Sequence, residues 1–92
     1  MTKVTENRRL RRFELAITDQ AIAAAYYKLR DGRVVLVHTA VPPDHAGQGF
    51  GSLLAAGTLE LLRASGRKAV PQCSFMTQFV LDHPEFTDVI AG

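Results

Sequence analysis

A glycine-rich stretch between a strand and a helix constrains this 92-residue chain more than any other feature. The run Val34–Val41 is apolar and rich in β-branched residues, which predicts a central strand covered on both faces. Gly47, Gly49 and Gly51 follow at alternate positions, and a helical run begins directly behind them. Glycines allow positive φ and a close approach of backbone to a ligand. Because the first N–H groups of a helix lack intrahelical partners, the stretch predicts a phosphate-binding loop or, alternatively, a simple strand-to-helix turn.

Further elements are predicted on both sides of this stretch. Apolar side chains alternate at Phe13, Leu15 and Ile17, as in a half-buried strand. Asp31-Gly32 is a strong signal for a tight hairpin turn. The predicted order is three antiparallel strands, a helix, a strand and a helix, at residues 12–18, 21–29, 34–41, 50–65, 67–73 and 75–82.

The step from the third strand through the first helix to the fourth strand is a crossover connection. Such connections are almost always right-handed and leave the two strands parallel. We therefore expect an α/β (α+β) domain with this parallel pair beside the glycine-rich loop. Ligands of such sheets bind beyond the carboxyl ends of the strands, where the glycines and Cys73 both fall. Since Pro71 has no N–H, the fourth strand is expected at an edge or where pairing opens.

The first predicted helix carries two apolar strips, and the second helix carries one. One strip of the first helix consists of Phe50, Leu53, Leu54, Gly57 and Leu61. Its other strip, made of Leu59 flanked by Ala55 and Leu62, needs the C-terminal segment or another chain to cover it. We therefore expect a monomer or a weak homodimer. In the second helix the residues expected to face inward are Phe75, Met76, Phe79 and Val80.

The net charge of +2 is unevenly distributed along the chain. Residues 1–12 hold five of the eleven Lys and Arg residues and a single acid, Glu6. We expect residues 1–11 to form a basic, flexible arm, frayed over residues 1–10, and residues 12–92 to form a single domain. A basic arm can bind nucleic acid, but a solvated leader is the favoured interpretation.

The other residue types exclude several classes of protein. A single cysteine, Cys73, excludes an internal disulfide framework and a four-cysteine zinc site, and it is compatible with a reducing cytoplasm. The three histidines lack metal-ligand spacing, so no metal site is predicted. The sequence shows no signal peptide, and no apolar run approaches the ~20 residues that cross a bilayer. We expect a cytoplasmic domain without membrane contact.

Two common phosphate-binding motifs do not fit the glycines. A P-loop requires Gly-Lys-Ser/Thr at its end, and no lysine follows Gly51 in that pattern. A dinucleotide fingerprint Gly-x-Gly-x-x-Gly fails in both frames, because Ser52 and Leu54 stand at the third glycine position.

The loop does resemble the acetyl-CoA loop of the GNAT acetyltransferase superfamily, which reads Arg/Gln-x-x-Gly-x-Gly/Ala. The frame here is Ala46-Gly47-Gln48-Gly49-Phe50-Gly51, with Ala46 where Arg or Gln is usual. The resemblance implies acetyl-CoA as cofactor, its pyrophosphate held by backbone N–H groups with help from His45 or Gln48. The implied cofactor-binding residues are Thr39, Val41, His45, Ala46, Gly47, Gln48, Gly49, Gly51 and Ser52.

From Phe13 to Phe86 the chain is similar to a family of short, single-domain GNAT-like proteins. The similarity rests on Asp31-Gly32, the glycine loop and three further blocks: His38-Thr39-Ala40-Val41-Pro42, Val70-Pro71-Gln72-Cys73-Ser74-Phe75 and His83-Pro84-Glu85-Phe86. It implies a compact GNAT-like fold with the parallel strand pair at the CoA cleft, without the N-terminal helices that usually shape an acceptor site.

Two residues are candidates for catalysis. Cys73 precedes a predicted helix N-terminus, a position that favours a thiolate able to accept an acetyl group; otherwise it is an ordinary buried cysteine. His38 on the central strand could take a proton from Cys73 or from an amine; otherwise it is a hydrogen-bonded core residue. His83 is expected to fix the turn before Pro84. In the alternative scheme of direct transfer, backbone donors at the strand end, residues 39–41, polarise the thioester carbonyl.

The resemblance implies an acetyl-CoA-dependent N-acetyltransferase acting on a small-molecule or peptide amine. The alternative is a non-catalytic CoA-binding or regulatory module that keeps the loop but not the chemistry. The amine acceptor cannot be named from the sequence.

Overall fold

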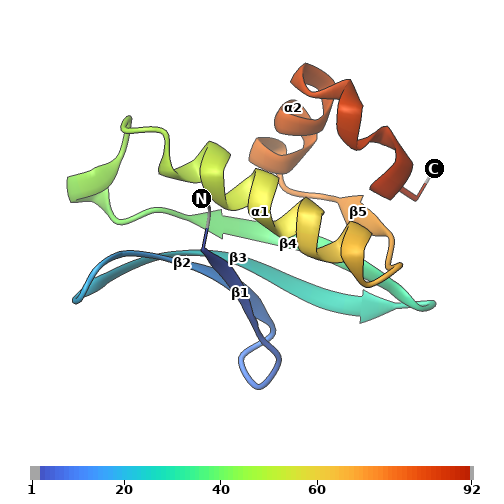
Figure 1. Ribbon diagram of the computed structural model, residues 1–92, viewed down its shortest axis with the longest axis horizontal. Helices are drawn as coiled ribbons and strands as arrows, with labels where there is room; N and C mark the ends of the chain where they lie inside the picture. The colour runs from blue at the N-terminus through green and yellow to red at the C-terminus, as the bar shows by residue number, and fades with distance from the viewer. Residues whose placement is uncertain (1–2, 92) are drawn as a thin grey trace.

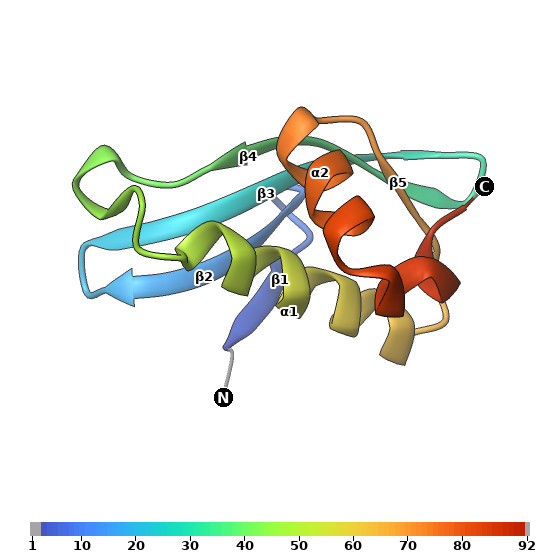
Figure 2. The ribbon, with the colours of Figure 1, turned by 90° about the horizontal axis from the view of Figure 1, so that it is seen from above.

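The five strands form one sheet in chain order, and both helices lie on the same face of it (Figures 1 and 2). The structure is a computed structural model that describes residues 3–91. Helix α1 packs over β1, β2 and β3, whereas α2 packs over β4 and β5. The strands and helices are β1 (Val4–Asn7), β2 (Arg12–Thr18), β3 (Ala21–Arg30), β4 (Arg33–Ala40), α1 (Phe50–Ala64), β5 (Ala69–Pro71) and α2 (Ser74–Asp82), with 3₁₀ turns at Pro43–His45 and Pro84–Val89.

Strand pairing confirms the predicted fold class. Strands β1 to β4 pair antiparallel, and β4 pairs with β5 in parallel through the crossover formed by α1. Asp31 and Gly32 both adopt positive φ, 53° and 75°, in the hairpin turn that joins β3 to β4. This turn is the one that Asp-Gly predicts.

Strand β4 is covered by helices on one face only, so the prediction of two covered faces is wrong. Val34 and Leu36 belong to the core beneath the helices. Val35 points to the other face and is nevertheless 2% exposed. Its neighbours across the sheet are Lys28 and Val70. Flanking side chains, rather than a second layer, therefore keep water from Val35.

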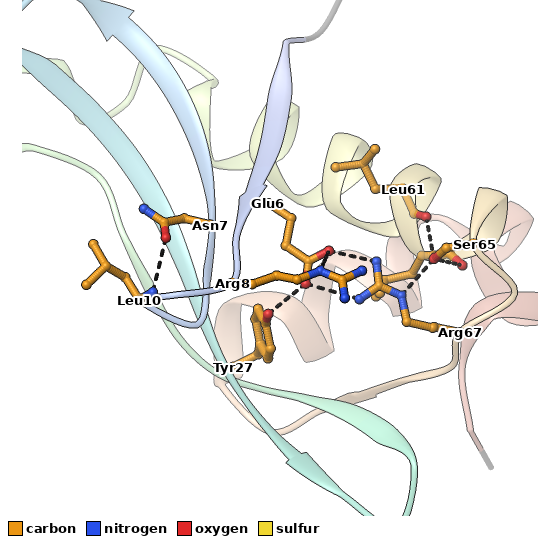
Figure 3. A network of polar contacts seen from close by, with 9 residues as sticks. Glu6, Asn7, Arg8, Leu10, Tyr27, Leu61, Ser65 and Arg67 are labelled. Atoms are coloured by element: carbon orange, nitrogen blue, oxygen red, sulfur yellow. Dashed lines mark hydrogen bonds and ion pairs between the residues drawn. The ribbon is translucent and has the colours of Figure 1, made fainter.

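The prediction of a frayed N-terminus is wrong for residues 4–7. These residues form β1, which pairs with β2 in the register Val4–Leu15 to Asn7–Arg12. Val4 is buried, and Glu6 is held by a polar network (Figure 3). Arg67 donates two hydrogen bonds to the Glu6 carboxylate, at 2.8 and 3.1 Å, and the Tyr27 hydroxyl donates a third at 2.6 Å. The network ties β1 to β3 and to the segment after α1.

Helix α1 turns a different face to the sheet than either strip alone suggests. Leu59 and Leu62, expected to need a further cover, are fully buried, whereas Leu53 is 46% exposed. The strip that hinted at self-association is therefore covered within the chain. The buried residues of the helix are Leu54, Ala55, Gly57, Thr58, Leu59 and Leu62. Among the described residues, neither helix has the length and apolar character needed to span a bilayer.

Replacing Glu6 by Gln is expected to lower the free energy of unfolding by about 1–3 kcal/mol at neutral pH, because the Arg67 hydrogen bonds lose their charged acceptor. The Arg67 guanidinium holds the pKa of Glu6 below its ordinary value. The stabilisation is therefore complete above the unfolded-state pKa of about 4.3 and is lost as pH falls through the lower folded-state value.

Urea unfolding across this range checks the prediction: the difference between wild type and E6Q should shrink in acid. Glu60→Gln is the control, since Glu60 is exposed on α1 and should matter by less than about 0.5 kcal/mol. A difference for E6Q that persists unchanged at pH 2 would contradict the role of the carboxylate.

Candidate functional site

The site begins where β4 and β5 stop pairing. Their ladder ends with Leu36 opposite Pro71, and the Leu36 carbonyl then accepts hydrogen bonds from both Gln72 N (2.9 Å) and Cys73 N (3.1 Å). Pro71 carries no N–H, so pairing cannot continue regularly here. Strand β4 runs on to Ala40 while the chain after β5 turns directly into α2 (Figure 2).

A β-bulge in β4 decides which side chains face this opening. Tyr27 pairs with Leu36 and Tyr26 pairs with His38, so Val37 is an extra residue. In a regular strand Leu36 and His38 would share a face; the extra residue reverses the alternation beyond it. Thr39, opposite Ala25, therefore lies on the helix-covered face, and His38 lies on the other face with Tyr26.

The bulge brings Thr39, rather than His38, to Cys73. The Thr39 Oγ1 and Cys73 Sγ atoms lie 3.4 Å apart, within hydrogen-bonding distance for sulfur. Cys73 is half-buried against the core. The exposed His38 ring stacks on Tyr26 at a centroid distance of 5.9 Å. The structure therefore does not bring together the two predicted catalytic residues.

Cys73 occupies the N-cap position of α2, because the helix begins at Ser74, one residue before the predicted start at residue 75. Its carbonyl accepts hydrogen bonds from the backbone N–H and the hydroxyl of Thr77, each at 3.0 Å. The Cys73 side chain makes no cap hydrogen bond to the first turn of α2, and its sulfur lies against the Thr39 hydroxyl instead.

The backbone of Thr39 is directed toward the opening. Tyr27 N donates to the Arg11 carbonyl of the neighbouring chain segment, so Tyr27 bonds on the β2 side of β3. Alternation along β3 places Ala25 on that side as well. Its partner Thr39 consequently turns its N–H and C=O away from β3, toward the side where β5 no longer pairs. These groups are available to a ligand.

The glycine loop forms a hollow of about 290 Å³ at the N-terminus of α1. Gly47 and Gly49 adopt φ of 79° and 86°, and Gly49 is the N-cap residue. No described side chain caps this end of the helix, and its first turn contains no acid, so its N–H groups suit an anion. The hollow is lined by Val41, His45, Ala46, Gly47, Gly49, Phe50, Gly51, Ser52 and Phe75.

Two of the predicted cofactor residues lie outside this lining. Thr39 lies at Cys73 instead, and the Gln48 side chain is exposed. His45 lies edge-on to the Phe50 ring at a centroid distance of 5.9 Å.

Phe75 is a lining residue that the sequence pattern missed. Helical periodicity predicts that it faces inward, yet it is 40% exposed and its ring covers Gly51. A Cβ at position 51 would lie 2.9 Å from the ring. Gly51 therefore serves the close approach of α2 to the loop. The signal lay in the spacing: Phe75 is two residues after Cys73, at the start of a helix facing the glycines.

The third histidine, His83, contacts the end of α2. His83 Nδ1 lies 2.8 Å from the Phe79 carbonyl, and its ring stacks on Phe79 at 4.0 Å. This is consistent with the predicted role in the turn before Pro84. Within residues 3–91, no three His, Cys, Asp or Glu side chains come together as a metal site would require.

Comparisons with known proteins point in one direction. A family model described as GCN5-related N-acetyl-transferase matches residues 12–89. Among solved structures, the chain is similar to a GCN5-like protein of Staphylococcus aureus determined in solution by NMR. The TM-score is 0.73 at 24% sequence identity, and the match covers 99% of this chain and 89% of the other. No curated protein matches the sequence.

Alanine substitutions at Gly49 and Gly51 separate two different demands on the loop. Gly49→Ala adds a Cβ where φ is 86° and nothing lies within 4 Å, so only backbone strain of about 1–2 kcal/mol opposes it. Gly51→Ala has a helical backbone but meets the Phe75 ring. Urea unfolding should show the larger loss for G49A, and NMR should show displaced Phe75 resonances only for G51A. Equal stability of G49A and wild type would contradict the left-handed cap.

Proposed function

Because the chain belongs to the GCN5-related N-acetyltransferase family, we propose that it binds acetyl-CoA at the glycine loop and transfers the acetyl group to an amine of a small molecule or peptide. The observation that carries the proposal is the arrangement of the two halves of the site. Phe75 lines the hollow at the loop and lies two residues from Cys73, which contacts Thr39 at the opening between β4 and β5.

The loop residues fit the pyrophosphate of this cofactor. The first-turn N–H groups of α1 and the positive-φ glycines supply donors without side chains in the way. Ala46 offers no side-chain donor, so backbone N–H groups bind the anion, assisted by His45 at the rim or by Gln48. Val41, Gly51 and Ser52 line the same hollow. When bound, acetyl-CoA supplies a thioester whose carbonyl carbon is open to nucleophilic attack.

Two routes use the residues at the opening. In the covalent route Cys73 Sγ would attack the thioester carbonyl and give its proton to the departing CoA sulfur. The amine would then attack the acetyl carbonyl on Cys73, and the amine proton would pass to the Cys73 sulfur as its bond to the acetyl group breaks. In the direct route the N–H of Thr39 would polarise the carbonyl while the amine attacks it, the C–S bond would break, and the amine proton would go to the departing CoA sulfur. The Thr39 hydroxyl, within 3.4 Å, orients the sulfur in the first route. His38 is a second candidate base. Its ring stacks on Tyr26 on the other face of the sheet, whereas Thr39 contacts Cys73 directly.

Intact mass after incubation with acetyl-CoA tests the proposal. Wild type should gain one acetyl group, and Cys73→Ala should gain none while its Tm still rises with acetyl-CoA. Gln72→Ala is the matched control, because Gln72 is an exposed polar residue next to Cys73, and its acetylation should match wild type. His38→Ala tests the base separately: acetylation should fall if the imidazole takes the proton.

The other outcomes distinguish the alternatives. Amine acetylation with no acetylated protein would indicate the direct route. A rise in Tm without transfer to any amine would indicate the non-catalytic CoA-binding module. Failure of millimolar acetyl-CoA to raise the Tm would refute the proposal.

Thr39→Val removes the hydroxyl while keeping the shape of the side chain. Loss of a hydrogen bond worth about 1 kcal/mol should slow acetylation of Cys73 about fivefold. The same variant should change the rate of Cys73 alkylation by iodoacetamide, because both reactions use the sulfur. A variant with altered turnover but unaltered alkylation would show that Thr39 acts on the substrate and not on Cys73.

A further inference from the structure

A second hollow, of about 370 Å³, lies at the opposite end of α1 from the glycine loop. The 15 residues of α1 separate the two ends by about 22 Å. This hollow is bounded by the β1–β2 turn, the β3–β4 hairpin and the segment after α1. Its lining residues are Glu6, Arg8, Arg11, Tyr27, Leu29, Gly32, Val34 and Arg67.

The floor of the hollow is apolar because the β3–β4 hairpin projects beyond its neighbour. Strand β2 begins at Arg12, opposite Tyr26, whereas β3 continues to Arg30. The inner face of this projection is left with Leu29, which is 55% exposed. Leu29, Gly32 and Val34 therefore offer a surface for the apolar part of a ligand.

Three arginines surround this floor. The Glu6 carboxylate lies between Arg8 and Arg67 (Figure 3), with Arg67 bound to both oxygens and Arg8 at 3.7 Å. The Arg8 side chain is 77% exposed. In the described part of the chain, no hydrogen bond or ion pair engages the side chain of Arg11. Glu6 thus neutralises one of three guanidinium groups, and a net charge of two positive remains.

We propose that this hollow binds a small organic phosphate. Guanidinium groups match phosphate oxygens in geometry as well as charge, and a phosphate monoester near pH 7 carries close to the two negative charges that the arginines leave unmatched. The volume lies in the range of small-molecule sites, which are apolar with a few convergent polar groups.

Titration with phenyl phosphate, followed by amide NMR shifts, tests the proposal. Shifts should appear at Leu29, Gly32, Val34 and Arg67. The double variant R8A/R11A should bind at least tenfold more weakly than wild type. The matched control R9A/R30A removes the same charge from exposed arginines that do not line the hollow, and its affinity should fall less than threefold. Both variants alter exposed residues, and unchanged Tm values would confirm that they fold.

Two further comparisons test the chemistry of the site. Inorganic phosphate should bind more weakly than phenyl phosphate because it leaves the apolar floor unused. Glu6→Gln, measured at a temperature where it is folded, should bind severalfold more tightly because the competing carboxylate is gone.

Several results would overturn the proposal: shifts confined to residues 46–52, equal affinity for inorganic phosphate, or weaker binding by folded E6Q. An oligonucleotide that binds more tightly than phenyl phosphate and loses as much affinity in R9A/R30A as in R8A/R11A would also overturn it, in favour of a nucleic-acid surface. None of these results depends on acetyl transfer, so the proposal stands or falls independently of the proposed function.

Discussion

The parting of β4 and β5 at Leu36 is the constraint on which the site depends. The parallel ladder is only three residues long, and the Leu36 carbonyl receives the last two N–H groups from the other strand. Since Pro71 prevents a regular continuation, the chain enters α2 at once and leaves Cys73 at its N-cap. The first turn of α2 then carries Phe75 over Gly51. One break in pairing thus sets the position of the thiol and of the aromatic wall of the hollow.

The strand order and the loop could be predicted because their signals are local. Alternation at Phe13, Leu15 and Ile17 gives β2, Asp31-Gly32 gives the hairpin, and the crossover gives the parallel pair. The phase of β4 beyond Leu36 could not be predicted. Val35, Val37 and Ala40 suit either face of a sheet, so no side chain marks Val37 as the extra residue. Because Val37 is the extra residue, Thr39 and not His38 lies beside Cys73.

The other differences arise from tertiary contacts that a local pattern does not contain. Strand β1 has one buried apolar residue, Val4, and its place depends on Glu6, whose partner Arg67 is 61 residues away. Helix α1 has leucines on most of its circumference, so the sheet, rather than periodicity, selects Leu59 and Leu62 over Leu53. Thr58 is buried on the same face, and its hydroxyl has no hydrogen-bond partner among residues 3–91; apolar periodicity does not predict a polar residue there.

The two ends of α1 require different means of holding an anion. At the N-terminus the N–H groups of the first turn and the dipole act together, so the proposed pyrophosphate site needs no charged side chain at Ala46. At the C-terminus the dipole is negative and would repel an anion. There the Ser65 hydroxyl caps the carbonyls of Leu61 and Leu62, and the Arg67 N–H also bonds Leu62. With those carbonyls satisfied, the guanidinium groups set the local field, and an anion site at this end has to be built from arginine side chains.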